Sequence, residues 1–175
     1  PNTKDLRNLQ EKTSLSKLLK SLRDTRASIP KKIPLFLKVA PDLTKSDITM
    51  MTDLVLQFDI DGIITTNTTL ERENLRSKYK DEQGGLSGRP LFIKSTKILA
   101  QFSKETKGQV PLIGVGGISS AEDAYIKIKA GASIVQLYSA LIYNGFSLVE
   151  KIFSELDQII KNDGYKNISE AIGIE

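Results

Sequence analysis

The sequence predicts an α/β fold in which helices cover a parallel β-sheet. Four short segments are rich in Ile, Val and Leu without polar alternation, which is typical of strands buried on both faces. These segments are PLFLKVA (34–40), DGIITTN (61–67), PLIGVGGI (111–118) and SIVQLYS (133–139). Helical patterns lie before, between and after them. We therefore expect one helix followed by four strand–helix units joined by right-handed crossovers.

The first two helices are predicted from apolar residues at helical spacing. The first spans 12–29, and its apolar face consists of Leu15, Leu18, Leu19 and Leu22. The apolar face of the second consists of Ile48, Met51, Val55 and Phe58. Thr44 and Asp47 have the spacing of a capping box, which marks the start of this second helix.

The remaining helices are placed by residues that favour helix ends. Pro90 suits the first turn of a third helix, whose apolar face consists of Ile98, Leu99 and Phe102. Ser120 can cap a fourth helix, which Gly131 ends. A fifth helix is indicated by Leu148, Ile152, Leu156 and Ile159.

Composition is that of an ordinary globular chain and narrows its chemistry. Of the 175 residues, 39% are hydrophobic and 26% are charged, as expected for one globular domain. The net charge is +4, but Lys and Arg are scattered and not interleaved with aromatic residues, so nucleic acid is not an expected partner. Neither Cys nor His occurs. Thiolate chemistry and the commonest general base and metal ligand are therefore excluded within this chain.

Glycines and polar residues gather where the expected strands end. Ligands bind at the carboxyl ends of the strands both in open parallel sheets and in (β/α)8 barrels, and either architecture fits the pattern. The residues at these ends are Lys38, Thr66-Asn67-Thr68, Gly114, Gly116, Gly117 and Tyr138-Ser139. The polar stretch 71–89 is longer than a strand–helix loop requires, so we expect it to be functional or mobile.

The segment GVGGISS (114–120) has two interpretations. Glycines at a strand end let backbone N–H groups approach an anion, and a helix capped by Ser120 adds the positive end of its dipole. A phosphate site often follows strands seven and eight of a (β/α)8 barrel. The alternative is a tight turn that needs glycine only for positive φ. The spacing differs from the GxGxxG dinucleotide motif.

Lys38, Asn67 and Thr68 also have two interpretations each. Burying the charge of Lys38 in its apolar run is costly unless an anion or an electron-rich ring accepts it. Alternatively its stem follows the apolar surface and its ammonium group reaches the rim. The amide of Asn67 and the hydroxyl of Thr68 suit a ligand with alternating donors and acceptors, such as a pyrimidine dione. Alternatively they close the strand in an Asx turn.

Six segments, in order, resemble successive motifs of dihydroorotate dehydrogenase. They are PNTKDLRNLQ, FLKVAPDL, DGIITTNTTLER, GGLSGRPL, PLIGVGGISS and GASIVQLYSAL. The resemblance covers almost the whole chain. It is closest to the membrane-associated, quinone-linked class, because APDL after the lysine and TNTTLxR favour that class over the soluble classes.

This resemblance implies that residues 1–175 are the C-terminal half of a single FMN-binding (β/α)8 barrel domain and supply strands five to eight. Pro1-Asn2-Thr3 is similar to the tail of a Ser-Ser-Pro-Asn-Thr motif that ends the fourth strand. In the quinone-linked class the catalytic base is the Ser directly before that Pro, so no catalytic base is expected in this chain. Strands one to four and the N-terminal helices that meet the membrane are expected outside it.

The resemblance also implies roles for individual residues. The expected contacts to FMN are Lys38, Thr66 and Gly88 at the flavin, and Gly117, Tyr138 and Ser139 at the phosphate. The expected pyrimidine ligands are Asn2, Asn67 and Thr68. No metal site is expected.

The implied reaction is the oxidation of dihydroorotate to orotate in UMP biosynthesis. A base takes the proton from C5, the flavin takes hydride from C6, and quinone reoxidises the flavin. The implied partners are the substrate and product, quinone, the preceding half of the barrel and a membrane surface. That surface is expected to be the cytoplasmic face of a bacterial inner membrane, or the inner mitochondrial membrane in a eukaryote. The alternatives are a soluble dehydrogenase using fumarate or NAD, and a non-redox phosphate-binding barrel fragment.

Overall fold

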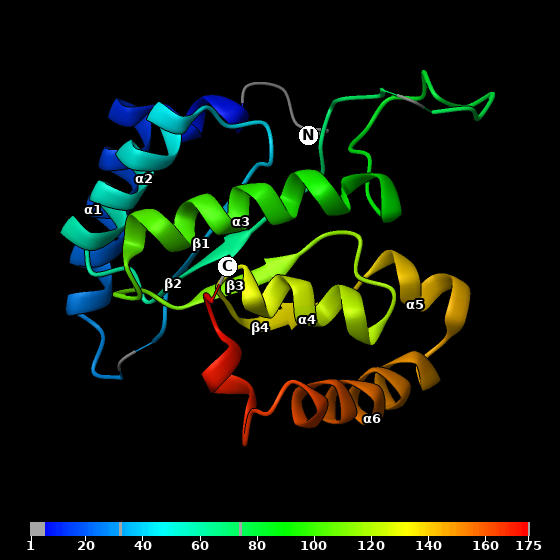
Figure 1. Cartoon of the computed structure of the whole chain (residues 1–175). Helices are drawn as coiled ribbons and strands as arrows, with labels where there is room; N and C mark the ends of the chain where they lie inside the picture. Colours follow the sequence, from blue (N-terminus) through cyan, green and yellow to red (C-terminus); the bar gives the residue numbers. More distant parts are fainter. Residues whose placement is uncertain (1–5, 32, 74, 175) are drawn as a thin grey trace.

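A four-stranded parallel sheet organises the chain (Figure 1). The computed structural model describes residues 6–31, 33–73 and 75–174. The strands are β1 (Phe36–Val39), β2 (Gly62–Thr65), β3 (Leu112–Val115) and β4 (Ala132–Gln136), and they lie side by side in chain order. The predicted α/β fold with a parallel sheet is confirmed.

Helices precede, connect and follow the strands. The α-helices are α1 (Lys12–Ala27), α2 (Lys45–Gln57), α3 (Phe92–Thr106), α4 (Ala121–Lys129), α5 (Ser139–Asn144) and α6 (Ser147–Asn162). The 3-10 helices are η1 (Leu6–Gln10), η2 (Arg89–Leu91) and η3 (Ile168–Ala171). Three of these elements, η1, α5 and η3, were not predicted. The start of α5 lies within the segment 133–139 that was expected to be strand, because the chain leaves the ladder after Gln136.

Each strand is shorter than the apolar segment that predicted it. β2 ends at Thr65 although its segment runs to residue 67, and β3 ends at Val115 although its segment runs to residue 118. In both cases the last residues of the segment leave the ladder and form a loop. These loops supply most of the walls of the site described below.

The predicted helix signals are largely confirmed. Thr44 Oγ1 accepts from the Asp47 N–H at 3.2 Å, and Asp47 Oδ2 accepts from the Thr44 N–H at 2.9 Å, which completes the capping box of α2. Ser120 Oγ accepts from the Asp123 N–H at 3.2 Å at the start of α4. Pro90 was expected in the first turn of the third helix, but it lies in η2, directly before α3.

The main core lies between one face of the sheet and helices α1, α2 and α3 (Figure 1). Each strand contributes one buried residue to it, namely Val39, Ile63, Leu112 and Ala132. Leu18 and Leu22 belong to the predicted apolar face of α1 but are each 38% exposed. That helix therefore buries a narrower stripe than its sequence suggests.

The opposite face of the sheet is open. One row of register partners crosses it, consisting of Lys38, Ile64, Ile113 and Ile134. Ile134 is 59% exposed, and Lys38 is exposed as well. The expectation that all four strands are buried on both faces is therefore wrong for β1 and β4. The reason is that the described helices pack against the face that carries Val39 and Ala132.

The long polar stretch between β2 and η2 is closed at its base. Thr69 and Leu86 form an isolated antiparallel bridge. The guanidinium of Arg72 donates to the carbonyl oxygens of Thr69, at 3.2 Å, and of Gly84. The stretch expected to be functional or mobile is thus pinned where it leaves and rejoins the body of the chain.

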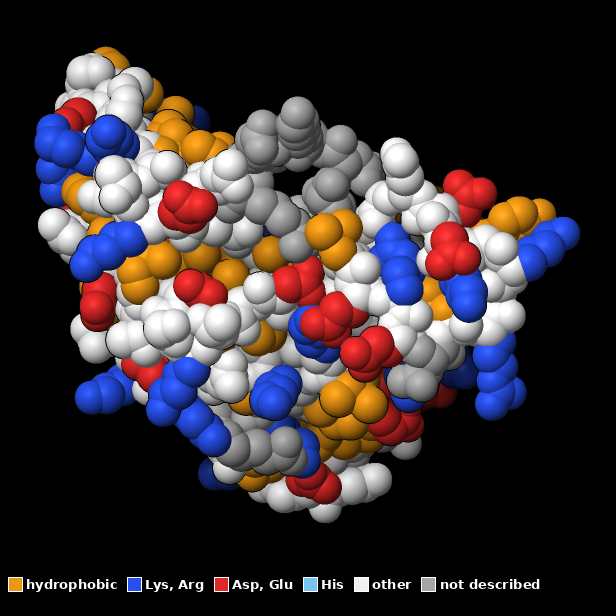
Figure 2. Space-filling view, turned by 90° about the horizontal axis from the view of Figure 1, so that it is seen from above, with side chains coloured by type: hydrophobic (Ala, Val, Ile, Leu, Met, Phe, Trp, Pro, Cys, Tyr) orange, Lys and Arg blue, Asp and Glu red, His pale blue; other side chains and the backbone are white. Residues whose placement is uncertain are grey.

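Charged side chains of both signs are interspersed over the surface. On the face seen in Figure 2, Lys and Arg side chains lie among Asp and Glu side chains. The positive net charge is therefore not gathered into one patch on that face. Within the described ranges, no helix has the length and apolar character needed to cross a membrane.

Candidate functional site

A cavity of about 690 Å³ lies at the carboxyl ends of the strands. Eight predicted site residues line it, namely Lys38, Thr66, Asn67, Thr68, Gly88, Gly117, Tyr138 and Ser139. The ninth, Asn2, lies outside the described residues. The structure thus brings together residues that are up to about a hundred positions apart in the chain, although it does not test the role expected for each.

The wall formed by β1 and the loop after β2 is polar. Lys38 is exposed towards the cavity side of the sheet, so the burial cost expected for its charge does not arise within this chain. Thr66 is buried, and its hydroxyl donates to the carbonyl of Asn67 at 2.8 Å. The peptide bond between Thr65 and Thr66 is cis.

The side-chain oxygen of Asn67 is engaged by a neighbouring residue, whereas no described residue engages its side-chain nitrogen. Its Oδ1 accepts from the backbone N–H of the adjacent Thr68 at 2.8 Å. This contact resembles the local turn interpretation but joins neighbouring residues, so it is not an Asx turn. For the Nδ2 group no acceptor is found in the part of the chain that the structure describes. The amide therefore retains two donors for a ligand.

Gly88 brings the end of the long polar stretch against the start of α5. Its φ is +71°, a conformation that side chains rarely adopt, and a Cβ at this position would lie 3.6 Å from the Cβ of Ser139. The hydroxyls of Ser87 and Ser139 are hydrogen bonded at 2.9 Å. Two segments that are 52 residues apart thus form one wall of the cavity.

The turn after β3 requires glycine for both conformation and space. Gly116 and Gly117 have φ values of +108° and +76°. A Cβ on Gly117 would lie 2.6 Å from the Cβ of Phe92, and one on Gly116 would lie 2.8 Å from Ser95 Oγ. Hence the turn packs closely against α3. The tight-turn interpretation of GVGG is correct, and it does not exclude anion binding on the other side of the turn.

Several backbone donors beside this turn remain available. Among the described residues, no hydrogen-bond acceptor is found for the N–H groups of Gly117, Ile118, Tyr138 or Ser139. All four residues line the cavity. Backbone N–H groups that converge from two loops are a common arrangement for holding an anion.

At the start of α4, the carboxylate of Asp123 is held by Ser119 and by Arg89. Asp123 Oδ2 accepts from the N–H and the hydroxyl of Ser119 at 3.0 and 2.9 Å. Arg89 donates to both carboxylate oxygens of Asp123, at 2.5 and 2.6 Å. Asp123 therefore occupies the Ser119 N–H, while Arg89 balances the negative charge that Asp123 brings to this helix end. The loop amides are further donors at this corner of the cavity.

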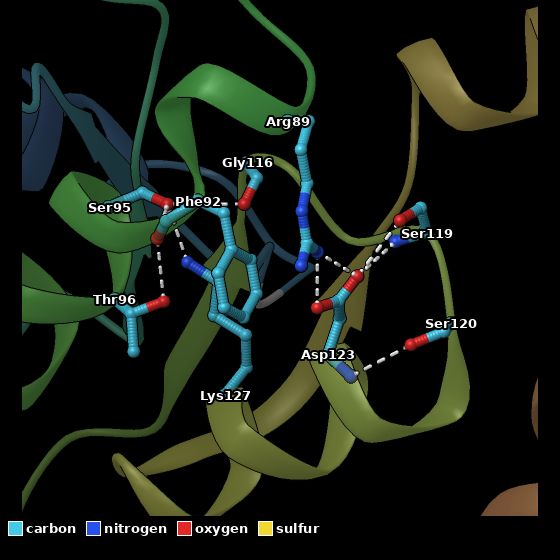
Figure 3. A network of polar contacts seen from close by, with 9 residues as sticks. All are labelled: Arg89, Phe92, Ser95, Thr96, Gly116, Ser119, Ser120, Asp123 and Lys127. Atoms are coloured by element: carbon cyan, nitrogen blue, oxygen red, sulfur yellow. Dashed lines mark hydrogen bonds and ion pairs between the residues drawn. The ribbon is translucent and has the colours of Figure 1, made fainter.

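The sequence interpretation missed Lys127 and Ser95, which lie behind the glycine turn (Figure 3). Lys127 has no exposed surface, and its Nζ donates to Ser95 Oγ at 2.5 Å. It lies 5.2 Å from the centroid of the Phe92 ring. Burial lowers the pKa of Lys127 to about 7, and the charge of Asp123 opposes part of this decrease. Nothing in the local sequence distinguishes this lysine from surface lysines of the same helix.

A second polar cluster joins the loops after β1 and β2 to α3. Lys94 Nζ donates to Asp42 Oδ1 at 2.6 Å and also contacts Glu71. Thr69 Oγ1 donates to the same oxygen of Asp42 at 2.5 Å. Burial raises the pKa of Asp42, but hydrogen bonds from Lys94, Thr69 and Leu70 outweigh it and leave that pKa below its usual value. The cluster fixes the base of the long polar stretch.

Comparison with known sequences identifies relatives along almost the whole chain. A family model described as dihydroorotate dehydrogenase matches residues 1–160. A protein of Cereibacter sphaeroides strain KD131 named dihydroorotate dehydrogenase (quinone) is 48% identical over 173 residues, which are 99% of this chain and 49% of that protein. A protein of the same name from Acinetobacter baumannii is 50% identical over 156 residues, covering 86% of this chain and 47% of that protein. The chain thus spans about half the length of these relatives.

Comparison with solved structures agrees with the sequence matches. The ligand-free dihydroorotate dehydrogenase of Eimeria tenella superposes with a TM-score of 0.95 at 40% identity, over 99% of this chain and 53% of that one. The same enzyme in complex with ferulenol gives a TM-score of 0.94 at 39% identity. The four-stranded sheet and its helices therefore have the same arrangement as about half of the chain in each of those structures.

Proposed function

The chain belongs to the dihydroorotate dehydrogenase family, and on this basis we propose that the protein containing it oxidises dihydroorotate to orotate with FMN as bound cofactor and quinone as electron acceptor. The observation that carries the proposal is the cavity at the carboxyl ends of the strands. It gathers lysine, threonine, asparagine and glycine from the ends of β1, β2 and β3, and tyrosine and serine from the end of β4. The quinone acceptor is supported by the names of relatives that are 44 to 50% identical.

The residues present fit a flavin mononucleotide. A volume of about 690 Å³ lies in the range of small-molecule sites. The glycine turn after β3 and the start of α5 offer backbone N–H groups to a phosphate, and Lys38 offers a positive charge from β1, at the opposite side of the sheet. When bound, FMN supplies the two-electron acceptor that the side chains of this chain lack.

Lys38 is proposed to stabilise negative charge that develops on the flavin side of the reaction. It stands at the end of β1, beside Ile64 of β2 in the sheet register, so its stem is supported by an apolar neighbour. No carboxylate of the described residues forms an ion pair with it. Its charge is thus available to a ligand in the cavity.

Asn67 and Thr68 are proposed to hold the pyrimidine ring. The free Nδ2 donor of Asn67 and the hydroxyl of Thr68 face a ligand that carries carbonyl acceptors and ring N–H donors. Their role is to fix the ring relative to the flavin, because correct orientation of the two rings contributes much of the rate. The base that removes the proton from C5 is proposed to be a serine that precedes Pro1 and lies outside this chain.

We place the protein at a membrane surface as part of the same proposal. Quinones reside in the bilayer, so an enzyme that reduces one must reach it. The membrane contact is proposed to lie outside this chain, as is the half of the barrel that covers the open face of the sheet. The exposure of Ile134 and Phe36 on that face supports the proposal that another part of the protein covers the sheet.

The test is made on the full-length protein. We expect one FMN per chain and formation of orotate from dihydroorotate with a quinone acceptor but not with fumarate or NAD. Lys38→Ala is expected to slow flavin reduction, whereas the control Lys104→Ala, at an exposed position of α3, leaves it unchanged. Asn67→Ala is expected to raise the Michaelis constant about tenfold with FMN still bound, because a buried partner on the substrate loses its hydrogen bond. A protein without flavin, or one active only with fumarate, contradicts the proposal.

A further inference from the structure

We propose that Lys127 is a positioning residue for the phosphate of the bound flavin. It acts through Ser95, which holds the Gly116 peptide so that the N–H of Gly117 is presented to the cavity, and it adds a buried positive charge behind that donor. The inference rests on the proposed function, because it assigns the phosphate of FMN to the glycine turn.

The hydrogen bonds around Ser95 have a defined direction. Lys127 Nζ carries only donors, so Ser95 Oγ must accept from it at 2.5 Å. The single proton of the Ser95 hydroxyl is then left for the carbonyl oxygens of Phe92 and Gly116, each 3.1 Å away. Lys127 therefore orients the serine, and the serine draws the Gly116 carbonyl towards α3 (Figure 3).

Peptide geometry then determines where the Gly117 N–H points. In a trans peptide the C=O of one residue and the N–H of the next point in opposite directions. Because the Gly116 carbonyl points back to Ser95, the Gly117 N–H points away from α3, on the side where both glycines line the cavity. Lys127 Nζ also approaches the Val115 carbonyl at 3.5 Å, which turns the Gly116 N–H in the same sense. Two successive amides thus point away from the buried lysine.

Few charged groups surround Lys127 among the described residues. The charged groups beside Lys127 are Asp123, one turn earlier on α4, and Arg89 from η2, which pairs with both oxygens of Asp123. From α3, Lys127 meets the Ser95 hydroxyl and the Phe92 ring, and from β3 it meets the Val115 carbonyl. Because Arg89 pairs with Asp123, that carboxylate offsets the charge of the buried ammonium group only in part. The ammonium group therefore adds positive potential behind the turn.

Protonation of Lys127 and phosphate binding are expected to favour each other. Burial lowers the pKa of Lys127 to about 7, so the free protein begins to lose this proton near neutral pH. A phosphate dianion bound on the far side of the turn raises that pKa again. Phosphate affinity is then expected to fall as pH rises above 7, over the interval between the pKa of the free form and the higher pKa of the bound form.

The experiment compares FMN with riboflavin, which differs from it only by the phosphate, in full-length apo-protein. We expect Lys127→Met to weaken FMN binding by about tenfold or more and to leave riboflavin binding unchanged. In the unaltered protein the ratio of the two affinities is expected to fall between pH 7 and pH 9, whereas in Lys127→Met it stays constant. The matched control is Lys129→Met, two residues further along the same helix and packed over the Tyr125 ring.

Each outcome separates the inference from the proposed function. If Lys127→Met weakens both flavins equally, or neither of them, Lys127 has no phosphate-directed role although the protein remains a flavoenzyme. If the unaltered protein binds neither flavin, the proposed function itself fails. If the Lys127→Met protein does not fold, the Ser95→Ala protein is used to test whether the glycine turn depends on this contact for phosphate binding. Removing the hydroxyl leaves the lysine in place but frees the Gly116 carbonyl, and a selective loss of FMN binding is again expected.

Discussion

Replacing Lys127 with Met is expected to stabilise the protein near neutral pH while weakening its phosphate site. Met has a similar length and no charge, so the cost of burying an ammonium group disappears. Ser95 keeps partners after the change, because it still donates towards the carbonyls of Phe92 and Gly116 at 3.1 Å. No buried polar atom is therefore left without a hydrogen bond at this serine.

The magnitude follows from the titration of the lysine. Burial lowers its pKa from 10.5 to about 7, which corresponds to about 5 kcal/mol between the two ends of the titration. Relaxation around a buried ion reduces such values, so the expected gain for Lys127→Met at pH 7 is about 1 to 4 kcal/mol.

The pH dependence has a definite sign. Between pH 7 and pH 10.5 the unfolded chain holds a proton on Lys127 that the folded chain has largely released, so the unaltered protein becomes more stable as pH rises through this window. Below pH 7 both the folded and the unfolded chain hold the proton, and the contribution of Lys127 to the free energy of unfolding stays at its minimum. The advantage of Lys127→Met is therefore expected to shrink by about 2 kcal/mol between pH 7 and pH 9.

Urea unfolding of the full-length apo-protein at pH 7, 8 and 9 measures this difference. Lys129→Met serves as the control for loss of a charge on the same helix, and its stability relative to the unaltered protein should not change with pH in this range. A Lys127→Met protein that is less stable at every pH by a constant amount would refute the reasoning. Lys127 would then be a charge stabilised by its surroundings and not one destabilised by burial.

Three further results are expected. Gly117→Ala should lower the free energy of unfolding by about 1 to 3 kcal/mol, because its Cβ would lie 2.6 Å from a Cβ of α3. In contrast Gly108→Ala, with a similar φ of +75° and no atom within 4 Å, should lose less. Lys94→Met should cost about 1 to 2 kcal/mol at pH 7. The Lys94→Met substitution should cost less near pH 3. The ionised Asp42, whose pKa is lowered in the folded protein, stabilises the fold above pH 3.8, and this stabilisation is lost as the carboxylate is protonated. Residues 1–175 expressed alone should form no orotate and should self-associate through their open strand edges, while co-expression with the preceding half of a full-length relative should restore FMN binding, followed by the change in flavin fluorescence. Equal losses of stability in the two glycine variants would contradict the first expectation. A Lys94→Met cost that does not depend on pH would contradict the second, and an active monomeric fragment would contradict the third.

The position of the site could be predicted from the sequence because the strand pattern determines it. Apolar runs without alternation indicate parallel strands, and parallel strands bring their carboxyl ends to one edge. Lys38, Asn67 and Gly117 were placed at that edge from their positions in the runs alone, and all three line the cavity. No contact between distant residues had to be known for this step.

What the sequence could not show depends on packing between elements. Lys127 and Lys129 lie in the same segment, YIKIKAG, with an isoleucine before each. Only the approach of α3, with Ser95 and Phe92, buries the first and leaves the second half-exposed. The exposure of Ile134 on β4 is expected for half of a barrel, but the apolar run alone does not reveal it, because a run does not show which faces of a strand its neighbours cover.

The charges around the glycine turn explain why a buried lysine can be retained at this place. Arg89 and Asp123 form a pair, so their contribution to a ligand in front of the turn is small. Without Lys127 the turn would offer only backbone dipoles to a phosphate that carries nearly two negative charges. A lysine exposed in the cavity would be screened by water, whereas one behind the turn acts through a medium of low dielectric constant. Binding of the anion then offsets the energetic cost of burying Lys127, because the anion raises the pKa of the lysine and so favours its protonated form.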